Sequence, residues 1–186
     1  MSYETITVAQ DGHVLTITLN VPERKNAMGP LMVNELLYAL DDAKDDKSVR
    51  VIVLTGAGNA FCAGGDLKQM GGGAGKVLKS KGDYADLLAR FPKLGKPTVA
   101  RLNGYAYGGG LGLVASCDFA VAKASVKVGT PEIHRGLFPM MIMAVLARIV
   151  PRRELLTMML LGDRLLAEDA LRVGLLTHVV PDDELD

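Results

Sequence analysis

Two glycine turns are the segments of this 186-residue sequence best suited to act on a carbonyl group. Gly64-Gly65 and Gly108-Gly109-Gly110 each follow a predicted buried strand and precede a predicted helix start. Because glycine has no Cβ, main-chain N–H groups there can approach a ligand closely, and a helix start favours negative charge. If the turns face each other, two N–H groups can converge on one oxygen as an oxyanion hole. The alternative is that the glycines only permit tight packing.

Glu132 is the acidic residue best placed to move a proton beside such a carbonyl. It follows a predicted short strand at 126–129 and the stiff pair Thr130-Pro131. An acidic residue after proline is also common in turns and as a helix cap, so that interpretation stays open.

The composition limits the class of partner. The 21 basic and 21 acidic residues cancel, and 49% of residues are hydrophobic. A balanced charge argues against nucleic-acid binding and against a basic membrane-facing surface. The first ten residues lack a signal-peptide pattern, and no apolar run reaches the ~18 residues of a membrane span. We therefore expect one soluble, cytoplasmic domain that acts on a small organic substrate.

The cysteines and histidines do not predict a metal or redox site. Cys62 and Cys117 have no CxxC spacing, so we expect buried thiols in a reducing compartment. His13, His134 and His178 lie far apart in the sequence and are expected to be non-catalytic.

Strand, turn and helix patterns alternate along the chain and predict the α/β class. Alternating residues on either side of Asp11-Gly12 predict a hairpin at 5–8 and 14–19. The glycine-rich stretch within 69–80 predicts a mobile loop. Further strands are expected at 51–54, 97–102, 119–122, 126–129 and 176–180, and helices at 30–45, 83–91, 140–149, 152–161 and 167–172.

Three ordered motifs resemble the enoyl-CoA hydratase/isomerase (crotonase) family. They are FCAGGDLK at 61–68, NGYAYGGG at 103–110 with Cys117-Asp118, and GTPE at 129–132 with GLFP at 136–139. The resemblance runs from the first hairpin to the end of the chain. It implies a crotonase-like spiral of repeated strand-strand-helix units, a homotrimer or hexamer, and acyl-CoA thioester substrates. It implies no separate cofactor, because CoA is carried as part of the substrate.

By motif position, the resemblance assigns the oxyanion donors to the N–H groups of Gly65 and Gly109. Glu132 would be the single acid/base for double-bond isomerisation or hydration of an enoyl-CoA. The two lysines of the implied CoA site have an alternative interpretation as solvated surface residues. The residues implied to bind CoA are Lys25, Ala27, Ala63, Asp66, Leu67 and Lys68.

The sequence departs from the family pattern in two places. Hydratases of the family usually carry a second glutamate where this chain has Gly112, so its absence favours isomerisation or a variant hydration. Residues 1–186 also form a crotonase-like core that lacks the usual C-terminal helical extension, for which we expect weaker assembly or a more exposed pocket. Both departures leave a non-catalytic acyl-CoA-binding or assembly member as the alternative.

Met140, Met141 and Met143 stand where many relatives have glycines, next to the expected acyl pocket. Core filling is the favoured interpretation, and shaping of the acyl pocket is the alternative. Nucleotide binding at the glycine turns is disfavoured, because the sequence has no Gly-Lys-Ser/Thr motif and no dinucleotide spacing.

Overall fold

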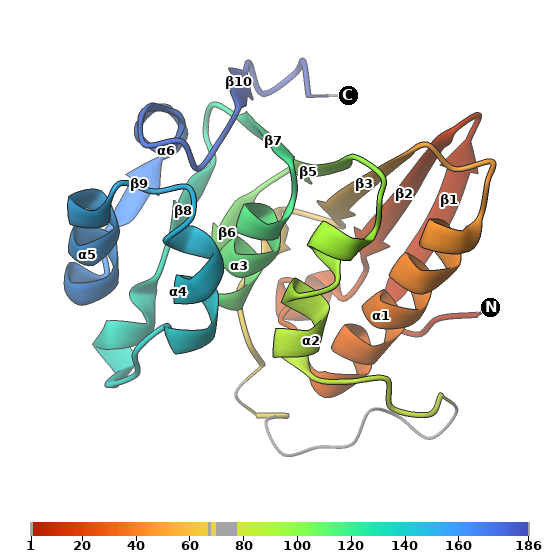
Figure 1. Ribbon diagram of the computed structural model, residues 1–186. Helices are drawn as coiled ribbons and strands as arrows, with labels where there is room; N and C mark the ends of the chain where they lie inside the picture. Colours follow the sequence, from red (N-terminus) through yellow and green to blue (C-terminus); the bar gives the residue numbers. More distant parts are fainter. Residues whose placement is uncertain (1, 67, 70–77, 186) are drawn as a thin grey trace.

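A six-stranded sheet forms the back of the structure, a computed structural model that describes residues 2–66, 68–69 and 78–185 (Figure 1). Its order is β1-β2-β3-β5-β7-β10, and only the β1–β2 hairpin is antiparallel. The Asp11↔Val14 pair closes that hairpin at the predicted Asp11-Gly12 turn, where Gly12 has φ +54°. The strands are β1 (Ile6–Asp11), β2 (Val14–Leu19), β3 (Val51–Gly56), β5 (Thr98–Leu102), β7 (Phe119–Lys123) and β10 (His178–Val180).

A second, four-stranded sheet has the order β4-β6-β8-β9, with β4, β6 and β8 parallel and β9 antiparallel to β8. No strand was predicted at 60–62, 105–107 or 164–166, where the structure has β4, β6 and β9, so the sequence-based prediction was wrong there. Three residues are too few to show the alternation that identifies a strand from sequence. The strands are β4 (Ala60–Cys62), β6 (Tyr105–Tyr107), β8 (Lys127–Gly129) and β9 (Arg164–Leu166).

In Figure 1, helix α1 lies in front of β1 and β2, α4 lies beside α3, and α5 and α6 lie beside β9. Helix α1 starts with Pro30 at its first turn and buries one apolar face, as predicted. In the described part of the chain, no helix is long and apolar enough to cross a membrane. The helices are α1 (Pro30–Asp45), α2 (Tyr84–Leu88), α3 (Gly109–Ser116), α4 (Met140–Leu146), α5 (Arg152–Leu161) and α6 (Ala167–Arg172), with 3₁₀ turns η1 (Pro22–Arg24), η2 (Phe91–Lys93) and η3 (Pro131–Arg135).

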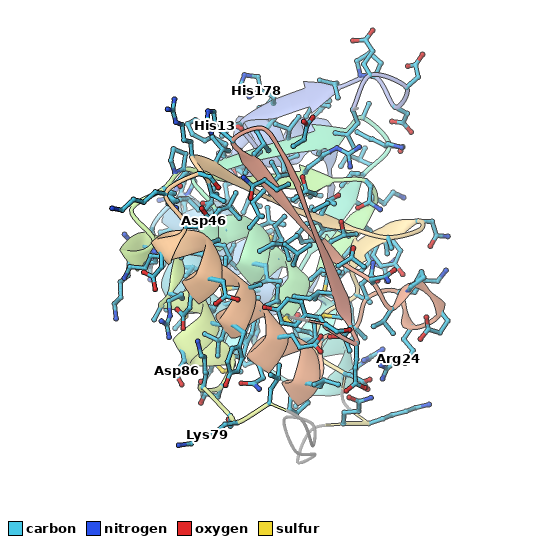
Figure 2. All side chains as sticks on the ribbon, turned by 90° about the vertical axis from the view of Figure 1, so that its right-hand side faces the viewer. His13, Arg24, Asp46, Lys79, Asp86 and His178 are labelled. Atoms are coloured by element: carbon cyan, nitrogen blue, oxygen red, sulfur yellow. The ribbon has the colours of Figure 1, made fainter. Side chains whose placement is uncertain are left out.

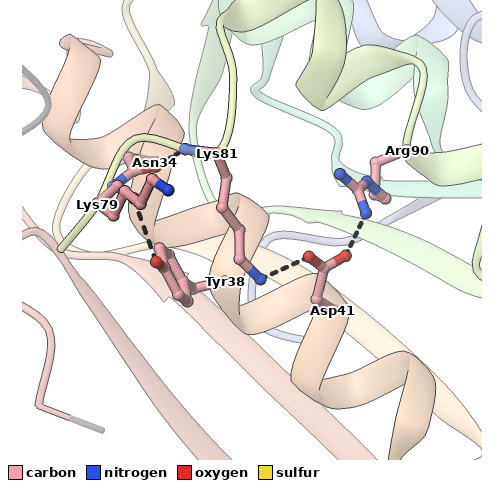
Figure 3. Close-up of polar contacts among 6 residues, drawn as sticks. All are labelled: Asn34, Tyr38, Asp41, Lys79, Lys81 and Arg90. Atoms are coloured by element: carbon pink, nitrogen blue, oxygen red, sulfur yellow. Dashed lines mark hydrogen bonds and ion pairs between the residues drawn. The ribbon is translucent and has the colours of Figure 1, made fainter.

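Polar contacts hold the segment before α2 against α1 (Figure 3). Asn34 accepts from the Lys81 N–H at 2.8 Å and donates to the Lys79 carbonyl at 3.2 Å, and Tyr38 donates to the same carbonyl at 3.1 Å. Asp41 accepts from Lys81 Nζ at 2.6 Å and also pairs with Arg90. The expected mobile loop is therefore anchored at its described end, while residues 70–77 lie outside the described residues.

Asn26 ties the segment before α1 to the segment around β4. This buried residue has φ +55°, a conformation that asparagine tolerates better than most residues. Its side-chain amide donates to the carbonyls of Ala57, Ala60 and Phe61 at 2.9 to 3.2 Å, and its Oδ1 accepts from the Val21 N–H at 3.0 Å. One side chain therefore satisfies four buried or partly buried main-chain groups.

Replacing Asn26 with alanine should lower the free energy of unfolding by about 3 kcal/mol, because buried main-chain groups lose their partners. Urea unfolding followed by circular dichroism measures this change. Asn20→Ala, at an exposed position, is the control and should shift stability by less than about 0.5 kcal/mol. Equal stability of Asn26→Ala and the parent would show that Asn26 does not hold these segments together.

Candidate active site

The candidate residues follow three adjacent parallel strands. Gly64 and Gly65 come after β4, Gly108 and Gly109 come after β6, and Glu132 comes after β8. Since β6 pairs in parallel with both β4 and β8, the carboxyl ends of all three strands lie at the same edge of the small sheet. The topology thus brings together groups that are 23 to 68 residues apart in sequence, in the way typical of sites at strand ends.

The two glycine turns contact each other through their backbones. A Cβ on Gly64 would lie 3.6 Å from the Gly109 nitrogen, and one on Gly109 would lie 3.6 Å from the Gly65 nitrogen. Neither the Gly65 nor the Gly109 N–H has a hydrogen-bond partner among the described residues. Gly109 is the first residue of α3, where a free N–H is expected because the helix supplies it with no acceptor. Two unpaired donors therefore lie side by side at a helix start.

Glu132 places a desolvated carboxylate beside these donors. Within the described residues, its buried Oε2 has no hydrogen-bond partner. Burial raises the pKa of Glu132 above its ordinary value, although a hydrogen bond from its own backbone N–H and, to a smaller extent, the charge of Arg135 oppose the shift. A carboxylate with one oxygen that is buried and without a hydrogen-bond partner is well prepared to accept a proton.

Position 108 requires glycine, both because of its backbone conformation and because of the space around it. Its φ is +50°, and a Cβ there would lie 2.7 Å from Glu132 Oε1. Its N–H donates to the Gly129 carbonyl at 3.0 Å. Glycine at 108 therefore lets the carboxylate lie directly against the start of α3.

Two hollows meet at these residues. One is a cavity of about 750 Å³ and the other of about 540 Å³, and Gly65, Glu132 and Leu137 line both. The larger cavity has a mostly apolar wall, which suits the hydrocarbon part of a ligand. Its other lining residues include Met28, Val33, Tyr84, Gly109, Phe138, Met140, Met141 and Ile142.

The methionines of α4 do not fill the core, so the favoured prediction for them was wrong. Met140 and Met141 are 68% and 51% exposed and line the larger cavity, while Ile142 between Met141 and Met143 is buried. The exposure of these methionines follows from the helical repeat. Ile142 faces the core, so the residues before and after it point to other faces of α4. Met140 and Met141 contribute to the wall of the cavity instead.

The residues expected to bind CoA come from two segments that run side by side. Ala63 N–H donates to the Lys25 carbonyl at 3.0 Å, and Met28 exchanges backbone hydrogen bonds with Gly64 and Asp66 at 2.8 and 2.9 Å. The backbone thereby brings Lys25, Ala27, Ala63 and Asp66 into one region. Lys68 is exposed, and Leu67 lies outside the described residues.

Arg24 is a site-region residue that the sequence analysis did not single out. Its guanidinium donates to Asp66 Oδ2 at 2.9 Å, and Asp66 Oδ1 accepts from the Lys68 N–H at 3.1 Å. Asp66 follows the Gly64-Gly65 turn, where a helix start was predicted, but among the described residues it caps a turn instead. The sequence could not reveal the ion pair, because its partners are 42 residues apart.

The histidines occupy different parts of the molecule. Figure 2 shows His13 and His178 toward one end and Arg24 toward the other. His134 lines the smaller cavity together with Glu132, while neither cavity is lined by His13 or His178. Cys62 and Cys117 are free thiols, and burial raises the pKa of each to about 12, so both stay protonated.

Tyr84 and Ile142 fill the space beside Gly112. A Cβ on Gly112 would lie 2.3 Å from Tyr84 Oη and 2.4 Å from Ile142 Cγ2. A second carboxylate at this position would therefore need both side chains to move, at a cost of about 1–3 kcal/mol for overpacking.

Comparison with known proteins identifies the class to which this fold and cavity belong. The structure of an enoyl-CoA hydratase from Bacillus anthracis, a crotonase-fold protein, matches with a TM-score of 0.87 at 30% identity, over 98% of this chain and 72% of that one. Probable enoyl-CoA hydratases of Mycobacterium tuberculosis (strain CDC 1551 / Oshkosh) and Rhizobium meliloti (strain 1021) are 37% and 38% identical over 189 residues, which span 100% of this chain and 72% of each relative. The family model described as enoyl-CoA hydratase/isomerase matches residues 9–186. The chain belongs to the enoyl-CoA hydratase/isomerase (crotonase) family, which confirms the resemblance and the fold class.

The raised pKa of Glu132 predicts a stability difference that depends on pH. Folding favours the neutral carboxyl, so this stabilisation is present below the unfolded pKa of about 4.3 and is lost as the pH rises through the higher folded pKa. Glu132→Gln, which stays neutral, should therefore be more stable than the parent near about pH 8 and should lose that advantage below about pH 4. Thermal unfolding across this range measures the difference. Glu184→Gln, at an exposed carboxyl, is the control, and a Glu132→Gln advantage that grew with acid would contradict the assignment.

Proposed function

We propose that this protein isomerises the double bond of an enoyl-CoA thioester, with Gly65 and Gly109 as oxyanion donors and Glu132 as the single acid/base. One observation carries the proposal. Two main-chain N–H groups without a partner among the described residues, and a carboxylate whose buried Oε2 also has none there, adjoin the same apolar cavity. A thioester carbonyl oxygen between Gly65 and Gly109 would accept both hydrogen bonds, which strengthen as negative charge develops on it.

Glu132 would then transfer one proton between two carbons. Its carboxylate removes a proton from the γ-carbon of a 2-enoyl thioester, or from the α-carbon of a 3-enoyl thioester. The dienolate that forms is stabilised by the two N–H groups. The same carboxyl group returns the proton to the other carbon, so one acid/base completes the cycle.

Hydration is the second candidate reaction, and the names of the relatives favour it. In that reaction Glu132 would activate a water that adds to the β-carbon. The occupied space beside Gly112 favours isomerisation, because it leaves no room for the second carboxylate that hydration usually uses.

Residues 24–28 and 63–68 are proposed to bind the nucleotide end of CoA. The support is the backbone contact between these segments, with exposed Lys25 and Lys68 nearby. Binding energy from this remote end would hold the acyl group against the donors. The assembly proposed for the active form is a homotrimer or hexamer, as the family resemblance implies.

The reaction class is tested with 2-enoyl-CoA and 3-enoyl-CoA esters of short and medium chain length. Interconversion of the two isomers, separated by liquid chromatography and mass spectrometry, is the expected result. A 3-hydroxyacyl-CoA product would make hydration the main reaction. Binding without conversion of any ester would establish the non-catalytic alternative and overturn the proposal.

Glu132→Gln should lower turnover by ~10²–10⁴ and leave acyl-CoA affinity within a few-fold, because glutamine keeps the size of the side chain but cannot cycle a proton. The measurement is deuterium exchange at the α- and γ-carbons of the ester in D₂O. Glu154→Gln, on an exposed face of α5, is the matched control. Exchange at the parent rate in Glu132→Gln would assign the base to another group.

Gly109→Pro should remove one oxyanion donor with little damage to α3, because proline is favoured at the first helical position. The lost donor should raise the activation free energy by about 3 kcal/mol. Gly109→Ala is the control, since it adds a similar Cβ near Met28 but keeps the N–H. Steady-state kinetics should show a far lower kcat for the proline than for the alanine variant, and equal values would remove Gly109 from the mechanism.

A further inference from the structure

Tyr84 is a polar cavity residue that the proposed reaction does not use. It is the first residue of α2, and its hydroxyl donates to the Gly109 carbonyl oxygen at 2.5 Å. Its ring also lies against Gly109, since a Cβ there would be 3.6 Å from Tyr84 Cζ. The phenol therefore contacts the residue that carries one of the proposed oxyanion donors.

The charge state of Tyr84 suits it to donate a hydrogen bond and not to act as a base. Burial raises its pKa well above the ordinary value, and Cys62 and Glu132 nearby add to that shift. The phenol stays neutral at any pH at which Glu132 can work as an acid/base. Its proton is already committed to the Gly109 carbonyl.

The peptide unit that carries the Gly109 N–H runs from the Gly108 carbonyl to the Gly109 nitrogen, and the Gly112 N–H donates to that carbonyl at 3.1 Å. Gly108, Gly109 and Gly110 have no side chains, and glycine is the residue with the greatest backbone freedom. On one side, the Gly108 N–H is held by the Gly129 carbonyl at 3.0 Å. On the other side, Tyr84 holds the Gly109 carbonyl. These two contacts hold the peptide units on either side of the one that carries the Gly109 N–H, so they limit rotation about the backbone bonds that would turn this N–H away.

We propose that Tyr84 is a positioning residue that helps to fix the direction of the Gly109 N–H, because its hydrogen bond to the Gly109 carbonyl holds the adjoining peptide unit. The inference rests on the proposed function, since it assumes that this N–H receives the thioester oxygen. A donor that is already aimed stabilises a developing oxyanion without reorganising during the reaction. Tyr84 then contributes to turnover without touching the reacting atoms.

Tyr84 is itself held rigidly enough for this role. Asp83 caps α2 by accepting from the Ala85 and Asp86 N–H groups at 2.8 and 3.0 Å, and Asp86 returns a bond to the Asp83 N–H at 2.9 Å. The preceding residues are anchored to α1 by the contacts in Figure 3. The start of α2 is therefore fixed from both sides of Tyr84.

The inference also explains why residue 112 is glycine in this chain. The Tyr84 hydroxyl occupies the position directly next to the Gly112 backbone, where a Cβ would come within 2.3 Å. Any side chain at 112 would displace the hydroxyl from the Gly109 carbonyl. Gly112 thus leaves room for the Tyr84 hydroxyl, and the hydroxyl in turn occupies the space that a second carboxylate at residue 112 would need.

Tyr84→Phe tests the inference, because it removes only the hydroxyl. We expect kcat to fall roughly 10- to 30-fold and KM to stay within about two-fold, since the aimed donor matters most in the transition state. Tyr3→Phe is the matched control. Tyr3 is also half-buried, and its hydroxyl bonds to Asp42, far from both cavities.

The infrared frequency of a bound thioester carbonyl distinguishes a changed direction of the Gly109 N–H from general structural damage. A saturated acyl-CoA with a ¹³C-labelled thioester carbonyl binds without reacting, and its infrared band should move to lower frequency on binding the parent protein. In Tyr84→Phe this shift should shrink, and in Tyr3→Phe it should not. Gly112→Ala, which pushes the same hydroxyl from the other side, should shrink it as well.

The outcomes distinguish the two proposals. If the parent protein binds the ester and Tyr84→Phe leaves both kcat and the carbonyl shift unchanged, the inference about Tyr84 is overturned and the proposed function stands. If the parent protein neither shifts the carbonyl band nor converts any enoyl-CoA, the proposed function itself is overturned. A reduced shift together with a reduced kcat in Tyr84→Phe, with normal thermal stability, supports the inference.

Discussion

The close approach of two backbone turns is the constraint on which the rest of this site depends. A Cβ on Gly64 would lie 3.0 Å from the Tyr107 carbonyl oxygen, and one on Gly110 would lie 2.5 Å from the Cys62 carbonyl oxygen. Such distances force neighbouring atoms to shift, so only glycine lets the turns after β4 and β6 meet. Once they meet, the Gly65 and Gly109 N–H groups are side by side, and the remaining groups are arranged around them.

The small sheet is what converts this contact into a site with a carboxylate. Strands β4, β6 and β8 are only three residues long, yet their parallel pairing sends three loops to the same edge. Glu132 arrives there on η3, and its carboxylate lies against Gly108. Because that space is already lined by backbone, Oε2 is desolvated without gaining a partner among the described residues. The same crowding that requires glycine therefore also perturbs the pKa of the acid.

The sequence predicted the elements whose patterns are long. Strand β2 and helix α1 were recognised because alternation and a helical apolar face persist over six or more residues, and β1 was recognised from the shorter alternation at 5–8 before the Asp11-Gly12 turn. Strands β4, β6 and β9 were missed because three residues carry no readable period, whereas the equally short β8 and β10 were predicted as parts of the longer segments 126–129 and 176–180. The glycines and Glu132 were singled out from local turn chemistry and motif, and the structure brings them together.

The contacts that the sequence could not show are those between distant segments. The bond from Tyr84 to Gly109 spans 25 residues, and the ion pair between Arg24 and Asp66 spans 42. Neither partner stands out in its own segment, since tyrosines and arginines at helix starts and 3₁₀ turns are common. The same limit applies to Met140 and Met141, because their exposure depends on which face of α4 meets α3.

The apolar wall of the larger cavity comes largely from one short segment, and this has a consequence for how such proteins diverge. Five consecutive residues supply four of the apolar side chains of this wall: Leu137, Phe138, Met140 and Met141. This segment is separate from the turns that carry the N–H donors. Methionine adapts to different shapes without a large energetic cost. Changes in this segment can therefore alter which acyl chain is accommodated while the donor geometry stays intact. The preference for a particular acyl chain can therefore change independently of the residues that act on the thioester carbonyl.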